Sequence, residues 1–208
     1  MKRKPVSAPA LKFPEVPSYM LDPGSKMEPC PEVGAWATSM FLEAESAFYN
    51  AAHEDIAEAV IGWVWTNVEN RKDGRIIRGT CGLGDPKGGT PWARARIYEQ
   101  LQRWFGLIPD FIITLDCVWL STREPTEICA LVEHELYHAR HKRDKWGEKS
   151  FDSDGRPVYD IRPHDLECFI GEVVRYGAWR PEFTEIAEAM AKGPAFSAVD
   201  LRSMCGVS

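Results

Sequence analysis

The stretch that decides the fold is Ile128-Cys-Ala-Leu-Val-Glu-His-Glu-Leu-Tyr-His138. Its apolar residues recur at the three- and four-residue spacing that is typical of one face of a helix, and we expect that helix to run from about residue 124 to 142. The last five residues, His134 to His138, have the form HExxH. Side chains four positions apart on a helix lie one turn apart on the same side. Both imidazoles can therefore bind one metal ion.

Glu135 follows the first of these histidines and would lie beside the ion without ligating it. A carboxylate in that place can take a proton from a water molecule that zinc has acidified. The pattern thus predicts His134 and His138 as zinc ligands and Glu135 as the catalytic base. Two readings compete with it, a pair of solvent-facing histidines and a structural zinc. Two histidines with a free glutamate suit an open catalytic site better than a closed structural one.

A catalytic zinc ion needs a third protein ligand, and the segment Arg162-Pro-His-Asp-Leu-Glu-Cys-Phe169 offers several. We expect a helix from about Asp165 to Tyr176, because Asp165 is a good N-cap. His164 would precede this helix and is the preferred ligand. Glu167, at the border of the apolar face, is the alternative, followed by Asp165. Carboxylates that do not ligate would support the ligand imidazoles or complement the helix dipole.

Three side chains near this segment could donate a hydrogen bond to a developing oxyanion: Tyr159, Arg162 and Tyr176. Two further histidines are expected to be bystanders. His141 would continue up the same helix, about 10 Å along the axis from His134 by the helical rise, and is predicted to be solvated. His53 stands alone after a turn, where a cap or a hydrogen-bonded polar residue is the usual role.

The rest of the chain predicts one domain of mixed helices and strands. Residues 1–33 hold seven of the fifteen prolines and are expected to form an irregular arm. The domain would cover residues 34–192 and be followed by a tail over 193–208. The expected helices lie at 36–48, 52–60, 91–105 and 181–191, and the expected strands at 60–66, 75–80 and 111–120.

Net charge, hydropathy and loop motifs argue against several classes of function. The net charge of −6 gives no overall positive field toward nucleic acid or anionic lipid. No apolar run approaches the roughly 20 residues that span a bilayer, so we expect a cytoplasmic protein without a membrane partner. The glycine-rich loop at 82–89 lacks the Lys-Ser/Thr ending of a P-loop, which disfavours nucleotide binding.

The six cysteines form no CxxC pair and are expected to be reduced and mostly buried. Four tryptophans at periodic positions are predicted to lie in the core: Trp36, Trp63, Trp65 and Trp92.

Several stretches resemble the metallopeptidase family encoded by bacteriophages and prophages. They include 132–139, 163–169 and 173–177, and upstream 48–50 with His53, 61–67, 92–96 and 109–116, so the resemblance covers roughly residues 36–180. The resemblance implies a zincin-like α+β fold, in which a small mixed or antiparallel sheet lies over the HExxH helix. It also implies that an edge strand, here residues 111–120, borders the cleft.

The order of motifs is also similar to SprT-like and WLM-type proteases. In those proteins a histidine after the HExxH loop is the third zinc ligand, which supports that role for His164. Here the loop between His138 and His164 is longer and highly charged, and Cys168 stands where a second acidic residue would be expected.

The leading hypothesis is a phage or prophage zinc metallopeptidase that cleaves a protein or peptide substrate through metal-activated water, in the bacterial host cytoplasm. One alternative is a zinc-stabilised, non-catalytic interaction protein with a zincin fold, which docks through its aromatic-rich N-terminal half. Another is a SprT-like, DNA-associated protease that uses the short basic run of Lys142, Arg143 and Lys145.

Overall fold

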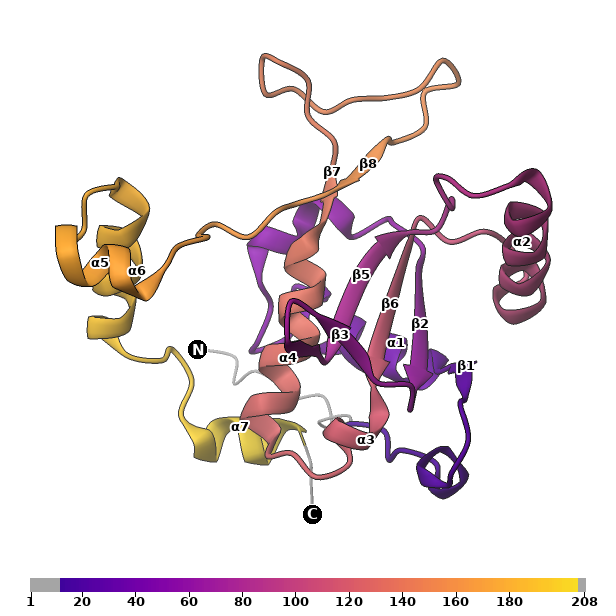
Figure 1. Cartoon of the computed structure of the whole chain (residues 1–208), viewed down its shortest axis with the longest axis horizontal. Coiled ribbons are helices and arrows are strands. Elements are labelled where there is room, and N and C mark those ends of the chain that lie inside the picture. Colours follow the sequence, from indigo (N-terminus) through magenta and orange to yellow (C-terminus); the bar gives the residue numbers. More distant parts are fainter. Residues whose placement is uncertain (1–11, 206–208) are drawn as a thin grey trace, which may run out of the picture.

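A mixed sheet of four strands lies at the centre of the computed structural model, which describes the backbone of residues 12–205 and side chains as far as Arg202 (Figure 1). The strand order is β1 (Met27–Pro29), β2 (Ile61–Thr66), β6 (Phe111–Asp116) and β5 (Gly79–Leu83). Strands β2 and β6 are parallel, and the two outer pairs are antiparallel. The crossover from β2 to β6 holds the hairpin of β3 (Asn70–Lys72) and β4 (Arg75–Ile77), then β5 and α2 (Pro91–Phe105).

The sequence explains why β2 and β6 are central. Both are rich in β-branched and aromatic residues, and Trp63, Trp65, Ile113 and Leu115 are all buried. Strand β5, by contrast, contains two glycines and forms an edge of the sheet. The edge strand that borders the cleft is therefore β5, and the expectation that residues 111–120 would form it is wrong.

Helix α4 (Pro125–His138) packs against the β5 side of the sheet and carries the HExxH residues (Figure 1). It begins with a capping box between Glu124 and Glu127 and has Pro125 at its first position, where the missing N–H costs nothing. Val132 and Leu136 are fully buried in the core. The helix ends at His138, four residues earlier than expected, because the chain becomes extended at Ala139.

The chain then forms β7 (Ala139–His141), a long projecting loop, and β8 (Tyr159–Ile161), which pairs with β7 (Figure 1). After β8, residues 162–169 lead to α5 (Ile170–Tyr176) and α6 (Pro181–Lys192), which lie away from the sheet. Helix α5 begins five residues later than expected, and no residue in it is buried. The helix expected at 181–191 is confirmed by α6.

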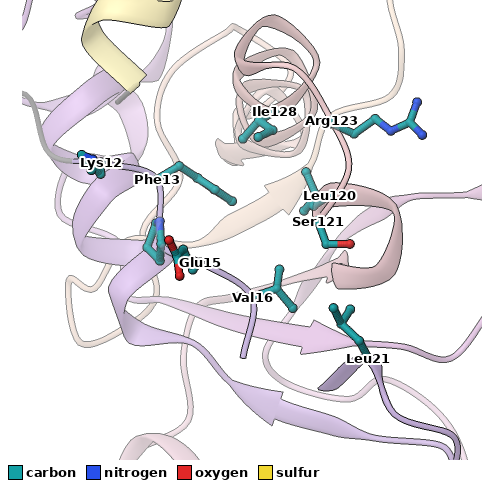
Figure 2. A pocket seen from close by; sticks show the side chains of 10 residues that line it. Lys12, Phe13, Glu15, Val16, Leu21, Leu120, Ser121, Arg123 and Ile128 are labelled. Atoms are coloured by element: carbon teal, nitrogen blue, oxygen red, sulfur yellow. The ribbon is translucent and has the colours of Figure 1, made fainter. Parts of the chain in front are cut away.

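The segment before β1 packs onto the core, contrary to the expectation of an irregular arm over its whole length. It contains a 3-10 turn, η1 (Ser18–Leu21), with Met20 fully buried. Phe13 contacts Trp36 edge to face, with 4.9 Å between ring centroids. A cavity of about 550 Å³ remains between this segment and the region where α3 (Cys117–Leu120) meets α4 (Figure 2). Residues 1–11 of the expected arm lie outside the described part.

The remaining helices pack around the sheet and α4. They are α1 (Pro31–Ala37), a π-helical turn η2 (Thr38–Leu42), a 3-10 helix η3 (Ala51–Ile56) and α7 (Ala198–Cys205). Helix α7 contacts α4 and buries Leu201, so the expected tail contributes to the packing.

Two further expectations are corrected. The strand predicted at 111–120 ends at Asp116, because the carboxylate of Asp116 accepts from the N–H of Trp119 and starts α3. Trp36, Trp63 and Trp65 are buried as predicted, but Trp92 is 84% exposed on α2. No helix of the described residues is both long and apolar enough to cross a bilayer.

Candidate metal centre

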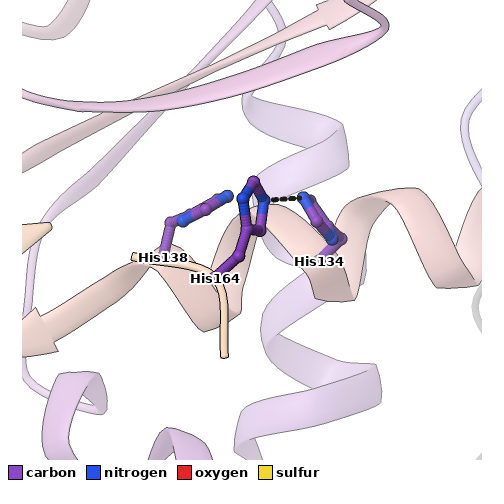
Figure 3. Close-up of side chains that lie close together, drawn as sticks. All are labelled: His134, His138 and His164. Carbon is purple, nitrogen blue, oxygen red and sulfur yellow. Dashed lines mark hydrogen bonds between the residues drawn. The ribbon is translucent and has the colours of Figure 1, made fainter. Parts of the chain in front are cut away.

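Three imidazoles converge beside α4. His134 and His138 lie one turn apart on the helix, with 4.9 Å between ring centroids. His164 comes from the segment after β8 and lies between them, its centroid 5.1 Å from that of His134 and 4.6 Å from that of His138 (Figure 3). One nitrogen from each ring lies within 4.8 Å of the other two. These are the residues that the sequence predicted as ligands.

The distances fit a shared metal ion. The Nε2 atoms of His134 and His164 are 3.2 Å apart. Two nitrogens that each bind a tetrahedral zinc at about 2.0–2.1 Å would lie about 3.3 Å apart. Burial, followed by the neighbouring His138 and His164, lowers the pKa of His134 below its usual value. Both causes favour the neutral imidazole, which is the form that binds a metal.

The backbone of Arg162 fixes the orientation of His138. The carbonyl oxygen of Arg162 lies 2.7 Å from Nδ1 of His138, and the Arg162 N–H donates to the His138 carbonyl at 2.7 Å. With Nδ1 donating to that carbonyl, Nε2 is the free ligand atom and points toward the other two rings. The same two hydrogen bonds place His164, two residues after Arg162, beside the helix.

Glu135 is buried between α4 and β5 and is only 3% exposed. Burial raises the pKa of its carboxyl to about 7, although a hydrogen bond from the Cys81 backbone lowers it in part. Its Oε2 atom is buried and has no hydrogen-bond partner among the described residues. A Cβ atom at Gly79 on β5 would come within 2.5 Å of Glu135 Oε1, so glycine gives this carboxylate its space.

A cleft of about 340 Å³ opens in front of these groups. Backbone and side chains of β4 and β5 form one wall, and α4 forms the other. Ile161 and His164 close one end. A buried carboxylate next to three converging imidazoles is an arrangement that can hold a metal ion and move a proton.

Comparison with known families agrees with this geometry. Residues 31–192 match a family model described as putative phage metallopeptidase. The chain belongs to this phage metallopeptidase family. The match runs from α1 to the end of α6 and so includes β2, β6 and β5 of the sheet, α4 and His164. Searches of curated proteins and of solved structures found no match.

The other acidic candidates lie outside the three-histidine cluster. The carboxylate of Asp165 forms an ion pair with the guanidinium of Arg162. Glu167 lies in a groove next to His164, and its main-chain oxygen accepts from Arg180 at 3.0 Å. Among the described residues, the candidate metal-binding group consists of histidines alone.

The proposed oxyanion donors are also set apart from the cleft. Tyr159 packs against Phe111, with 5.1 Å between ring centroids. Tyr176 is exposed on α5, and neither tyrosine lines the cleft. Arg162 directs its guanidinium over the ring of Tyr137 and toward Asp165.

His141 is not solvated, so that prediction is wrong. It is buried on β7, and its Nε2 lies 2.8 Å from the Ser150 carbonyl oxygen. The prediction assumed that the helix continues past His138, whereas the chain turns into a strand there. The ring of His141 helps to close the base of the projecting loop by packing against Phe151.

Sequence reasoning overlooked a polar cluster on another side of α4. Asn50 donates from Nδ2 to Glu133 Oε1 and to the Tyr137 hydroxyl, both at 2.7 Å. His53 is buried, with Nε2 3.5 Å from Glu133 Oε1 and its ring against Tyr137. Burial would raise the pKa of Glu133, but His53 and Asn50 lower it overall. These contacts bind η3 to α4 through the residues that precede His134 and His138.

Proposed function

We propose that this phage metallopeptidase is a zinc-dependent peptidase of zincin-like architecture. The observation that carries the proposal is the buried, unpartnered Oε2 of Glu135 beside the converged nitrogens of His134, His138 and His164. Three histidines are a ligand set that zinc favours in catalytic sites and that leaves one coordination position open. When bound, such an ion acidifies water and polarises a carbonyl group.

Glu135 would act as the base. Its raised pKa, near 7, suits a group that accepts a proton from water and returns it to the leaving amine at neutral pH. Gly79 and the backbone of β5 keep its carboxylate in place. Arg162, through its carbonyl, holds His138 in the tautomer that ligates.

The free edge of β5 would align the substrate. Strand β5 pairs with β6 on one side only, and its other side borders the cleft. An extended peptide can bind such an edge through main-chain hydrogen bonds. This favours a protein or peptide substrate in an extended conformation, which we place in the cytoplasm of a bacterial host.

Two of the three residues of the basic run already interact with neighbouring side chains, which disfavours the DNA-associated alternative. Arg143 forms an ion pair with Asp55, with 2.6 Å between Nη2 and Oδ2. Lys145 lies over the ring of the neighbouring Trp146. Salt-dependent binding of single-stranded DNA would nevertheless favour that reading over ours.

Metal content measured by mass spectrometry tests the ligand set. We expect one zinc ion in the wild type and in Glu167→Ala, and its loss in His164→Ala. Zinc that is kept in His164→Ala and lost in Glu167→Ala would make Glu167 the third ligand.

Peptide hydrolysis tests the chemistry. Glu135→Gln should retain zinc and lose roughly 10²- to 10⁴-fold in turnover, the usual contribution of a general base. Equal activity of Glu135→Gln and wild type would overturn the mechanism. A zinc-loaded wild type that cleaves no unfolded protein would favour the non-catalytic interaction protein.

A further inference from the structure

A second groove continues from the metal centre toward α5 and α6. It has a volume of about 970 Å³ and shares His164 and Ile77 with the cleft that holds Glu135. The β3–β4 hairpin forms one wall, and the segment before α5 together with the α5–α6 connection forms the other. A polypeptide bound at the metal centre can therefore enter this groove without leaving the surface.

Large apolar side chains line the α5–α6 wall and are left uncovered. Phe169 is 81% exposed and Trp179 is 56% exposed, and both line the groove. Phe169 has no ring contact or side-chain hydrogen bond among the described residues. Neither kind of contact therefore explains why this aromatic side chain stands here. Two large exposed aromatic side chains next to a candidate active site are typical of a binding surface.

The aromatic wall is already ordered. Trp179 donates from Nε1 to Glu172 Oε1 at 2.8 Å. The guanidinium of Arg180 lies over the rings of Trp179 and Phe183, 5.0 Å and 4.8 Å from their centroids. Because the polar atom of Trp179 is satisfied, its ring can offer an apolar face at little additional ordering cost.

The charges of the groove indicate which side chain it would accept. It is lined by three basic residues, Lys72, Arg75 and Arg180, and three acidic ones, Asp73, Glu167 and Glu172. A groove with both signs in equal number offers no net attraction to a charged side chain. Recognition must then come from burial of apolar surface on Phe169 and Trp179.

We propose that this groove is a specificity subsite, and that it binds a large, uncharged apolar side chain, aromatic or aliphatic, of an extended peptide. The inference rests on the proposed peptidase function. An extended strand advances roughly 3.3 Å per residue, so the recognised residue would lie within a few positions of the bond that is cut. The apolar segments of an unfolded protein chain fit this requirement, since in folded proteins such side chains are mostly buried.

Binding to an inactive variant tests the subsite apart from catalysis. The probes are two short dye-labelled peptides of glycine, serine and alanine, identical except that one has a central phenylalanine and the other an alanine. We expect zinc-loaded Glu135→Gln to bind the phenylalanine peptide at least about tenfold more tightly by fluorescence anisotropy, a factor that corresponds to about 1.4 kcal/mol.

Substitutions in the groove should remove this preference. Phe169→Ala, which removes a largely exposed side chain, and Trp179→Ala should each bring the two affinities closer, and the double variant should make them equal. Trp92→Ala, which removes a tryptophan exposed on α2 outside the groove, is the control and should leave the preference intact. Equal affinities in the parent, or a preference that survives the double variant, would overturn the subsite.

The active protein separates this inference from the proposed function. Digestion of a peptide mixture by the wild type should show large apolar residues enriched at one fixed position beside the cut, and Phe169→Ala should reduce that enrichment. Cleavage without any such enrichment would overturn the subsite and leave the peptidase standing. Selective binding by Glu135→Gln together with no cleavage by the wild type would overturn the peptidase alone.

Discussion

The two parts of the chain that meet at the metal centre are held in different ways. Helix α4 carries His134, Glu135 and His138 and is fixed by buried Val132 and Leu136. His164 belongs to a segment without regular structure, followed by α5, in which no residue is buried. The buried part carries Glu135 and two of the clustered histidines, whereas the exposed part carries His164 and the aromatic groove wall. Residues of the groove wall can thus vary while those on α4 stay fixed.

Truncation of one apolar side chain in each part tests this difference most strongly. Leu136→Ala should lower the free energy of unfolding by about 2–5 kcal/mol, because it leaves a cavity under α4. Met190→Ala, on the exposed surface of α6, should change it by no more than about 0.5 kcal/mol. Denaturant unfolding measures both. Losses of similar size would mean that the two parts are held alike.

A substitution on β5 should disturb the catalytic carboxylate without unfolding the chain. In Gly79→Ala the new methyl group would meet Glu135 Oε1 at 2.5 Å, and the carboxylate must move. We expect turnover to fall by about tenfold to a hundredfold, as misplaced catalytic groups do, with zinc content unchanged. Gly82→Ala on the same strand meets nothing within 4 Å and is the matched control. Full activity of Gly79→Ala would show that the Glu135 position is adaptable.

The polar cluster on the other side of α4 should contribute a smaller amount of stability. Asn50→Ala removes the hydrogen bonds to Glu133 and Tyr137, and we expect a loss of about 1.5–3 kcal/mol, typical of hydrogen bonds to a charged group. Asn70→Ala, exposed on β3, is the control and should cost no more than about 0.5 kcal/mol. Thermal unfolding compares the two. An equal effect would argue that η3 does not hold α4.

The smallest effect concerns the projecting loop and depends on pH. Burial would raise the pKa of Asp55, but hydrogen bonds from Lys149 and Arg143 lower it overall. Because the folded pKa is depressed, the stabilisation is present above the ordinary aspartate pKa of about 3.9 and is lost as the pH falls through the lower folded value.

Asp55→Asn should therefore cost up to about 1 kcal/mol at neutral pH and nothing at strongly acid pH, since the ion pairs are partly exposed. Unfolding curves at both pH values give the difference, and Asp154→Asn at the tip of the loop is the control. A cost for Asp55→Asn that persists in acid would assign it to packing and not to charge.

The HExxH helix and the placing of His134 and His138 on one side of it could be predicted from sequence, because local spacing decides both. Residues four apart on a helix share a side, and a capping box and Pro125 mark where that helix begins. The density of candidate ligands in the sequence indicated His164. Its position beside α4, however, depends on the pairing of β7 with β8. That pairing joins two segments that are distant in the sequence, and the residue pattern within either segment does not predict it.

The failures have a common physical origin. The alternation in 111–116 is typical of a half-buried strand, yet the strand is central, and the true edge strand β5 has two glycines and a weak strand signal. The helix expected from Asp165 would have an apolar face, but α5 begins only at Ile170, and Phe169, Ile170 and Val174 are exposed. Whether a helix face is buried depends on the element that packs against it. The sequence of the helix alone does not specify that element.

The pairing of β7 with β8 has one more consequence, for changes in chain length. Ala139 pairs with Ile161 immediately beyond the two hydrogen bonds between His138 and Arg162. The position of His164 is thus set by main-chain atoms at the base of the projection and does not depend on the number of residues in its outer part. The two exposed turns of the projection, at 144–147 and 152–155, are therefore natural places for insertions, and a reporter peptide could be grafted there while the three histidines stay in register.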